Sequence, residues 1–268
     1  MPSCGIGLGL PYAGTGIDPD ALAYFNRAGI TDSTARQQIL DFVKGVKALG
    51  LWNNFVCWPL RSSQNVGSGV IARSLGGLGT FDGTFTSSGA LPTWGADGIN
   101  LDASIQGMGG ASLSALSQQV LTGGYVIRRN ATNTVNRLLF STSGGSRNFA
   151  LAVYGSTTIG MSRLGAFDAN GTLEVGGLGS SAFVSSFEMA SANQNAGNLN
   201  IFRNGSLIGS LASTPLTRIE STQVMFGSIF ASGTHVIPFA YFSTLSSANT
   251  ASIYSLYKST LGVGLGLP

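Results

Sequence analysis

The sequence predicts a single all-β domain, an antiparallel sandwich, with a short helical segment in front of it. From residue 51 onward, short apolar or alternating runs are separated by Gly, Asn and Ser, a pattern typical of the strands and turns of a sandwich. At 268 residues the chain also has the length at which an all-β sandwich forms one domain rather than two.

The helical segment is predicted from its caps and its spacing. Asp18 and Pro19 form a suitable N-cap and first helical residue, and Thr31 or Asp32 can cap a second helix that Gly50 ends. Apolar residues recur at helical spacing in this second helix: Ala35, Ile39, Phe42, Val43, Val46 and Leu49. This stripe must be covered, either by the domain that follows, which is the default, or by another subunit.

Several short runs are predicted to be strands because they are apolar or alternating and are bounded by turn residues. They lie at 54–60, 125–128, 137–141, 149–154, 181–189, 199–203, 223–230 and 236–242. Asn204-Gly205 gives the clearest local signal, because Asn-Gly supplies the two positive φ angles of a type I′ hairpin. After the last run, Ser246 or Ser247 can cap a closing helix with a single buried face.

The two ends of the chain carry nearly the same segment, GIGLGLP at 5–11 and GVGLGLP at 262–268. Leucines in such flexible segments are exposed to water unless they lie on another surface. Two interpretations stay open: arms that dock on a neighbouring subunit, or coincidence in a Gly-rich chain. We divide the chain into an N-terminal tail and helical arm, 1–50, and a sandwich domain, 51–268, that includes the closing helix and the second tail.

Charge is scarce in this chain. Only 9% of the residues are charged and the net charge is +3, whereas 43% are hydrophobic, which argues against disorder and suits a protein that works in an assembly. The one basic doublet, Arg128-Arg129, is too small a footprint for nucleic-acid binding. The sequence shows no signal-peptide pattern and no run of membrane-spanning length. We therefore expect synthesis in a host cytoplasm and exit by lysis or inside a particle.

Several segments, taken in order, carry a family resemblance. GTF at 83–85 and PTWGADGINL at 92–101 look like an opening pair of strands, IFRNG at 201–205 like a hairpin, and the ends of 240–257, AYFSTLS and IYSLY, like a closing strand and helix. Over about residues 75–261 they resemble the laminin G-like, concanavalin A-like jelly-roll modules of phage and prophage virion structural proteins. The resemblance implies a concanavalin-like jelly roll in a virion, and it implies little about ligand because this fold hosts many functions.

The acidic residues do not form a catalytic pattern. A retaining glycosidase needs two carboxylates about 5–5.5 Å apart. The three glutamates, Glu174, Glu188 and Glu220, lie far apart in the sequence, and none has an acidic neighbour at i+2 or i+4. We therefore expect no enzyme and assign no catalytic residue.

The histidine and the loop aspartates do not indicate a site either. His235 is the one histidine and precedes an apolar strand, so we expect a loop hydrogen-bonding group rather than a base. Asp82, Asp97, Asp102 and Asp168 occur singly and are expected in turns. One of them could hold Ca²⁺ with backbone carbonyls, but we assign no metal ligand and no cofactor.

The remaining candidates are expected to have structural roles. Aromatic side chains can stack on sugars, but those beside the apolar strands are expected in the core or an interface: Trp52, Trp58, Trp94 and Tyr125. Cys57 is expected to be a small buried hydrophobe and Cys4 a tail thiol. The GGLG segments at 76–79 and 176–179 lack the ending of a phosphate loop and are expected to be turns.

Two hypotheses about function follow. The first is a bacteriophage virion structural protein, a capsid decoration or a head- or tail-fibre component. It would be a homo-oligomer, with a trimer among the arrangements, held to other virion proteins by its helical arm and tails and exposing its jelly roll. The alternative is a receptor- or carbohydrate-binding tail protein that recognises host-surface glycans. A polysaccharide-cleaving enzyme would need an acidic cleft that the sequence does not show.

Overall fold

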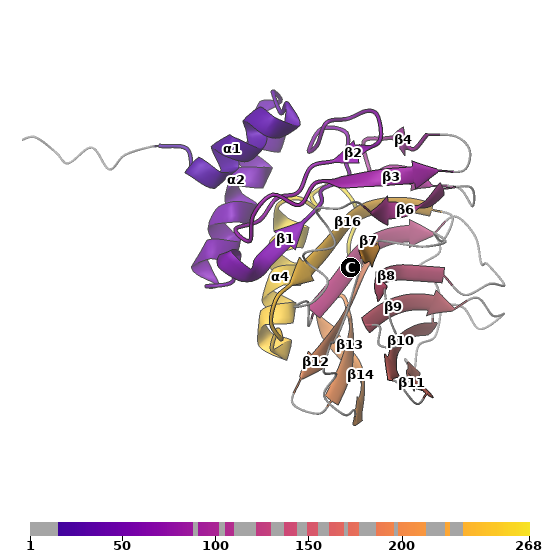
Figure 1. Cartoon of the computed structure of the whole chain (residues 1–268). Helices are drawn as coiled ribbons and strands as arrows, with labels where there is room; N and C mark the ends of the chain where they lie inside the picture. The colour runs from indigo at the N-terminus through magenta and orange to yellow at the C-terminus, as the bar shows by residue number, and fades with distance from the viewer. Residues whose placement is uncertain are drawn as a thin grey trace, which may run out of the picture.

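The chain folds into layers of helix and sheet. The structure is a computed structural model, and it describes residues 16–87, 91–101, 105–109, 122–129, 137–143, 149–154, 161–168, 171–176, 186–195, 198–212, 223–225 and 233–268. Figure 1 shows the helices on one side of a large curled sheet and a second sheet on its other side. The protein is therefore mostly β with few helices, consistent with the predicted antiparallel sandwich.

The helices begin and end where their caps predict. They are α1 (Pro19–Ala28), α2 (Ser33–Ala48), the 3-10 helix η1 (Trp52–Asn54) and α4 (Ser247–Ser259). The side chains of Asp18, Asp32 and Ser246 each accept a hydrogen bond from a backbone N–H in the first turn of α1, α2 and α4 respectively. Gly50 follows α2 with a φ of 71°, the left-handed conformation that ends many helices.

The described strands form three antiparallel sheets. The large sheet has the order β14-β13-β12-β7-β16-β5-β4, and β1 pairs with the end of β16. Its strands are β1 (Phe55–Cys57), β4 (Thr93–Trp94), β5 (Ile99–Leu101), β7 (Thr122–Arg129), β12 (Glu188–Asn195), β13 (Asn198–Arg203), β14 (Ser206–Ala212) and β16 (Gly233–Tyr241).

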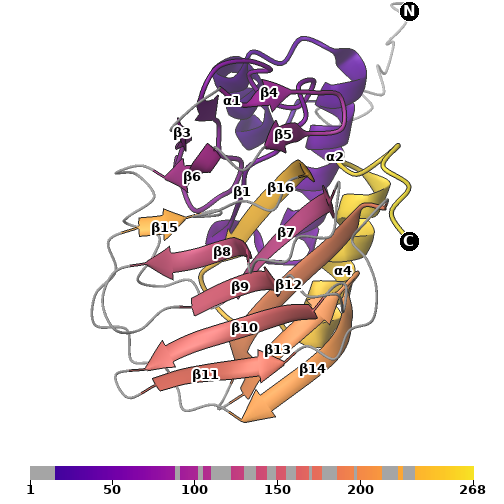
Figure 2. The ribbon, with the colours of Figure 1, turned by 90° about the vertical axis from the view of Figure 1, so that its right-hand side faces the viewer.

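The other two sheets are smaller. The second sheet has the order β11-β10-β9-β8-β15 and lies in front of the large sheet in Figure 2. Its strands are β8 (Arg137–Ser143), β9 (Phe149–Tyr154), β10 (Met161–Asp168), β11 (Gly171–Gly176) and β15 (Gln223–Met225). The third sheet has the order β2-β3-β6, with β2 (Ile71–Ala72), β3 (Gly83–Ser87) and β6 (Ile105–Gly109).

The apolar stripe of α2 is buried within the chain itself. Ile39, Phe42 and Val46 are at most 1% exposed and belong to the same buried cluster as Phe239 on β16 and Val126 on β7. Intramolecular packing, the default expectation, is therefore confirmed. The cluster crosses residue 50, so the two helices are part of the main core and are not a free arm, while the division of the chain at that residue stays a prediction.

Three aromatic rings in contact connect the helices to the large sheet, the first pair tilted and the second stacked. The ring centroids of Phe42 on α2 and Phe55 on β1 are 5.9 Å apart, and those of Phe55 and Phe239 on β16 are also 5.9 Å apart. Phe239 lies over Gly124 on β7, where a Cβ would come within 2.2 Å of its ring. A glycine is required there, because any side chain would push the ring off the sheet.

The predicted hairpin is confirmed and has a second role. Asn204 and Gly205 have φ angles of 48° and 78°, as a type I′ turn between β13 and β14 requires. A Cβ on Gly205 would lie 3.0 Å from the Cα of Ala251 and 3.1 Å from the Cβ of Tyr254, both on α4. The turn therefore forms part of the surface on which α4 rests.

Strand β12 lies further along the chain than predicted. The sequence favoured 181–189 because it is apolar, but the structure has Glu188–Asn195 as the strand, and 181–185 lie outside the described residues. The polar residues of β12 are accommodated by hydrogen bonds: Asn193 is 1% exposed, donates to the carbonyl of Leu245 and accepts from Asn200. A hydrophobicity pattern does not detect such a strand, because its buried polar side chains have hydrogen-bond partners and need not be apolar.

The second Gly/Leu tail folds back onto its own chain. Leu265 and Leu267 are each 6% exposed and belong to the main core cluster. Arg61 Nη1 donates to the carbonyls of Leu261 and Val263, at 3.0 and 2.9 Å. This tail is therefore not an arm for a neighbour, and the first tail, 5–11, lies outside the described residues. No helix in the described ranges is both long and apolar enough to cross a membrane.

Removing residues 1–50 should destroy cooperative folding, because the deletion takes away much of the core that covers the large sheet. We expect a broad, non-cooperative thermal transition by circular dichroism and strong binding of a hydrophobic dye. A chain that lacks only 1–15 keeps both helices and is the control. A sharp transition near that of the full chain in the 1–50 deletion would contradict the shared core.

Gly124→Ala should destabilise the chain by about 1–3 kcal/mol, because the added methyl group overpacks the contact with Phe239. Gly209→Ala on β14 is the matched control, since a methyl group added there would have no atom within 4 Å. Urea unfolding of both variants measures the difference. Equal stabilities would show that the ring of Phe239 can move aside.

Candidate functional site

Two adjoining hollows flank the side chain of Trp52, where helix α1 meets the turn at 75–80. One has a volume of about 260 Å³ and the other about 210 Å³, and both are lined by Asp20 and Trp52. Lys47 and Asn53 line the first, and Arg27 lines the second. We call the two hollows together the Trp52 groove. Each is smaller than the roughly 300–1,000 Å³ of drug-sized sites, so each suits a small polar group.

Trp52 lines both hollows, and its side chain is held by the helix and the turn around it. The residue is only 6% exposed, and its Nε1 donates to Asp20 Oδ2 at 3.0 Å. The Gly76-Gly77 turn lies directly against it: a Cβ on Gly77 would come within 2.3 Å of Trp52 Cδ1, and one on Gly76 within 2.1 Å of the carbonyl of Phe55. The 76–79 segment is thus a turn, as predicted, and glycine is required because the turn touches the ring.

Lys47 holds two carboxylates at one end of the groove. Its Nζ lies 2.8 Å from Asp18 Oδ1 and 2.6 Å from Asp20 Oδ2, and 5.4 Å from the centre of the Trp52 ring. Burial raises the pKa of Asp18, but the hydrogen bond from Lys47 and the backbone N–H groups of α1 outweigh it and hold that pKa below its usual value. Burial lowers the pKa of Lys47, but the two carboxylates raise it by more, so this pKa lies above its usual value. The carboxyl of Asp18 and the ammonium of Lys47 are therefore charged at neutral pH.

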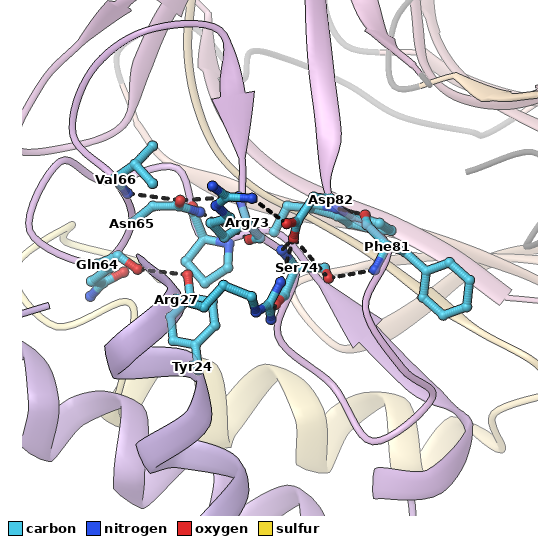
Figure 3. Close-up of polar contacts among 11 residues, drawn as sticks. Tyr24, Arg27, Gln64, Asn65, Val66, Arg73, Ser74, Phe81 and Asp82 are labelled. Atoms are coloured by element: carbon cyan, nitrogen blue, oxygen red, sulfur yellow. Dashed lines mark hydrogen bonds and ion pairs between the residues drawn. The ribbon is translucent and has the colours of Figure 1, made fainter. Parts of the chain in front are cut away.

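Arg27, which lines the second hollow, belongs to an ion cluster drawn in Figure 3. Asp82 lies between two arginines, with Arg27 Nη1 on its Oδ1 and Arg73 Nη1 at 2.6 Å from its Oδ2. The backbone N–H of Ser74 donates to the same carboxylate at 2.9 Å. Burial raises the pKa of Asp82, but these donors outweigh it and keep the pKa below its usual value. Asp82 was expected in a turn as an isolated residue, and it is instead the centre of this cluster.

The loop behind this cluster is ordered by buried amides, also drawn in Figure 3. Tyr24 on α1 donates through its hydroxyl to the carbonyl of Gln64 at 2.8 Å. Asn65, 3% exposed, donates to the carbonyl of Pro59 at 2.6 Å and accepts from the backbone N–H of Arg73 at 3.1 Å. These bonds fix Arg73, and through it Asp82, relative to α1.

The free energy of unfolding should fall as the pH drops below about 4. The carboxyl pKa values of Asp18 and Asp82 are lower in the folded chain than the value of about 3.9 expected in the unfolded chain. The two carboxylates therefore contribute fully to the free energy of unfolding above the unfolded-state pKa, and this contribution is lost as the pH falls through the folded-state pKa. Asp82→Asn should lower stability at pH 7 by about 1–3 kcal/mol and flatten the acid limb. Urea unfolding between pH 2 and 7 measures both effects.

Asp41→Asn is the control for that series, because Asp41 is an exposed carboxylate on α2 outside both clusters. An unchanged acid limb in the Asp82 variant would mean that other carboxylates carry the acid sensitivity. The basic limb has the opposite sign: the raised pKa of Lys47 gives a stabilisation that is lost only as the pH rises through that folded value.

The aromatic residues considered for sugar stacking are mostly buried, as their packing role predicts. Trp58 is 0% and Tyr125 1% exposed. The Nε1 of Trp58 donates to the carbonyl of Phe81 at 2.8 Å. Trp94 is half-buried, with its Nε1 on the carbonyl of Gly69 and its ring edge-on to Phe85. Of the expected candidates, Trp52 alone lines the hollows described above, and it presents little of its ring.

His235 lies in a strand and not in a loop, which corrects the expectation. It is part of β16, is 0% exposed, and its Nδ1 lies 3.0 Å from the hydroxyl of Tyr125 on β7. Its ladder partner is Ile127, and the neighbouring Val126 belongs to the cluster on the helix side of the sheet. Successive residues of a strand face opposite sides, so Ile127 and the imidazole of His235 point to the face opposite the helices. It is a core residue of the large sheet.

The remaining acidic residues are dispersed. Glu174 lies on β11 of the second sheet and Glu188 on β12 of the large sheet, and Asp168 ends β10 opposite Gly171. Asp97 lies in the turn between β4 and β5, 3.8 Å from Arg128. Glu220 and Asp102 lie outside the described residues. Within the described ranges, no group of three or more His, Cys, Asp and Glu side chains is placed to hold a metal ion.

Cys57 is buried and unbonded to another cysteine, and Cys4 lies outside the described residues. Cys57 is 0% exposed and its Sγ lies 3.4 Å from the carbonyl of Leu75. Burial raises the pKa of its thiol well above the usual value. It is a small core residue, as the sequence predicted.

Sequence reasoning considered Trp52 but missed the charged residues that line the groove with it. Asp20 and Lys47 are separated by most of two helices, and Asp18 was recognised as a helix cap without its lysine partner. The first turn of α1 and the last turn of α2 lie next to each other, because Lys47 contacts both Asp18 and Asp20. The signal available in the sequence was the pair of acidic residues at the start of one amphipathic helix and the basic residue at the end of the next.

No protein-family model matches this chain, and no curated protein matches it. Among solved structures, it is similar to a sialidase of Trypanosoma rangeli, with a TM-score of 0.54 and 10% identity over 85% of this chain and 40% of the sialidase. It is also similar to the receptor-binding domain of botulinum neurotoxin type G, with a TM-score of 0.51 and 14% identity over 75% of this chain and 50% of that one.

A third similar structure comes from botulinum neurotoxin type C, with a TM-score of 0.52 and 11% identity over 76% of this chain and 52% of that chain. The chain thus spans about half or less of these proteins. At such low identity the likeness concerns the fold alone, and the fold it supports is a jelly-roll-like β-sandwich.

Proposed function

We propose that this chain is a non-catalytic recognition module that binds glycans, with the Trp52 groove as its binding site. The observation that carries the proposal is the position of two polar groups beside Trp52. Among the described residues, both contacts of the Asp20 carboxylate involve Oδ2, which leaves Oδ1 to accept hydrogen bonds from sugar hydroxyls. The amide of Asn53, an exposed residue, lines the same hollow and can donate and accept.

The charges of the groove favour a neutral sugar. Lys47 is paired with Asp18 and Asp20, and Arg27 is paired with Asp82, so neither cation is free to neutralise an acidic ligand. Hydroxyl groups, in contrast, can bind to these ionised groups without displacing a partner. A neutral sugar unit in each hollow therefore matches the chemistry.

The proposal that the chain is not an enzyme rests on the same residues. Asp20 lines the groove and Asp18 lies beside it, and the ammonium group of Lys47 contacts both carboxylates. A glycosidase needs one carboxyl group with a raised pKa to donate a proton to the leaving group. The Asp18 pKa is lowered instead, which argues against that role for this carboxyl.

The similar structures support glycan recognition as the general function. The cell entry of the type C toxin depends on its interaction with two ganglioside molecules, and the T. rangeli sialidase has been solved with sialic acid. Within the sandwich class we propose the concanavalin-like, laminin G-like jelly roll for this chain. The contact between the Asn204-Gly205 turn and α4 supports it, since these are the hairpin and the closing helix of the resemblance.

We place the module on a phage virion as a structural or receptor-binding component, in oligomeric form. The scarcity of charge, 9% of residues, supports a role within an assembly. Attachment would then use surfaces other than the stripe of α2 and the leucines of the tail, Leu265 and Leu267, because the chain buries these in its own core. Co-sedimentation of the full chain and the chain lacking 1–15 with virions tests this setting separately from glycan binding.

Asn53→Ala should abolish or weaken glycan binding by about tenfold, the loss expected when a buried hydrogen bond to a ligand disappears. The wild-type chain is first applied to an array that carries neutral oligosaccharides and ganglioside oligosaccharides. The neutral glycan that binds best is then titrated against the wild type and the variant by calorimetry.

Asn54→Ala is the matched control, because Asn54 is the neighbouring exposed amide and does not line the hollows described above. It should bind like the wild type. Binding to no glycan on the array, or equal binding by all three proteins, would overturn the Trp52 groove as the site.

A further inference from the structure

A row of polar side chains, separate from the residues that line the Trp52 groove, crosses the large sheet. Thr93 on β4 is paired with Asn100 on β5, Asn100 with Thr234 on β16, and Thr234 with Arg128 on β7. Cross-strand partners point to the same face of a sheet, so the four side chains lie in line and span about 14 Å. We call these four residues the Arg128 row.

Arg128 is held in place by an aromatic ring and not by strong polar contacts. Its guanidinium lies 4.4 Å from the centre of the ring of Phe187, which is buried. Its Nη2 lies 3.4 Å from Thr234 Oγ1 and 3.8 Å from Asp97 Oδ2. Among the described residues these are its polar contacts, and both involve Nη2, so the Nε and Nη1 donors have no protein partner there.

The orientation of the rest of the row follows from a short chain of hydrogen bonds. Thr234 is 3% exposed, accepts from Arg128 and donates to Asn100 Oδ1 at 2.9 Å. With its oxygen so occupied, the amide of Asn100, an exposed residue, directs its N–H donors away from Thr234. The hydroxyl of the exposed Thr93 follows next in the row.

These groups suit a carboxylate flanked by hydroxyl groups. A guanidinium binds a carboxylate through two parallel hydrogen bonds, and stacking on an aromatic ring fixes the plane of that fork. Asp97 is the acidic group that faces Arg128, but the contact is long and the Asp97 side chain is 44% exposed, so this ion pair is weak and a ligand carboxylate can replace it. Asn100 and Thr93 then lie within the reach of neighbouring hydroxyl groups.

We propose that the Arg128 row is a second binding site, which takes an acidic sugar chain through a uronate carboxylate on Arg128 and through hydroxyl groups on Asn100 and Thr93. The amide and hydroxyl groups along the row favour a sugar over an acidic peptide, whose side chains would offer them few hydroxyl partners. This site is distinct from the Trp52 groove and does not depend on the function proposed for that groove.

The test is calorimetric titration of the full chain with an oligogalacturonate and with a neutral galactose oligomer of equal length. The acidic chain should bind at least about tenfold more tightly, and added salt should weaken it. Arg128→Gln should weaken the acidic chain by about tenfold or more, and Arg128→Lys by less, since lysine keeps the charge but lacks the fork. Thermal unfolding of each variant verifies that the fold is intact, and the lysine variant keeps the test decisive if the glutamine variant unfolds.

Two controls separate this proposal from its alternatives. Lys44→Gln removes the same charge from an exposed residue of α2 and should not change binding, whereas an equal loss would indicate non-specific attraction and overturn the site. Asn53→Ala should also leave oligogalacturonate binding unchanged, and a loss there would assign the acid to the Trp52 groove instead. Absence of binding to oligogalacturonate, or equally tight binding of a glutamate-rich peptide, would likewise overturn the proposal.

Discussion

The aromatic contacts among Phe42, Phe55 and Phe239 join helix α2, the short strand β1 and strand β16 of the large sheet, and the positions of the other features described above depend on them. They fix α2 against the sheet, and therefore fix the end of α2 at which Lys47 meets the start of α1. Phe55 directly follows η1, so the same contacts set the position of Trp52. The groove therefore depends on the apolar contacts of Phe42, Phe55 and Phe239, which fix the elements that line it.

Two clusters of charged residues lie where elements are joined. Lys47 links α2 to the cap of α1, and Asp82 links α1 to the loop that carries Arg73. Partly buried pairs with several hydrogen bonds fix geometry more effectively than scattered exposed pairs, which contribute little. Six charged residues of these two clusters thus connect α1, α2 and the 73–82 segment.

Local signals in the sequence were sufficient for the helices and the hairpin, because caps and the Asn-Gly turn act over a few residues. They were not sufficient for β12, whose buried Asn193 depends on Leu245 more than fifty residues later. The Trp52 groove and the Arg128 row could not be predicted for the same reason, because strand register and packing between distant segments assemble each of them. No pattern along the chain states that Thr93 and Arg128 lie on one face, whereas the pairing of β4, β5, β16 and β7 does.

The pairing of β1 with β16 has a consequence for how the chain reaches its native state. Phe55 lies opposite Tyr241, so the first strand completes its ladder only after nearly all the other strands have been made. Contacts this far apart in sequence slow folding, since a long loop must close before they form. During synthesis the apolar faces of α1 and α2 must wait, uncovered, for β16 to emerge from the ribosome. The nascent chain is therefore prone to aggregation over most of its length, and a chaperone that shields the first fifty residues would raise the yield of folded protein.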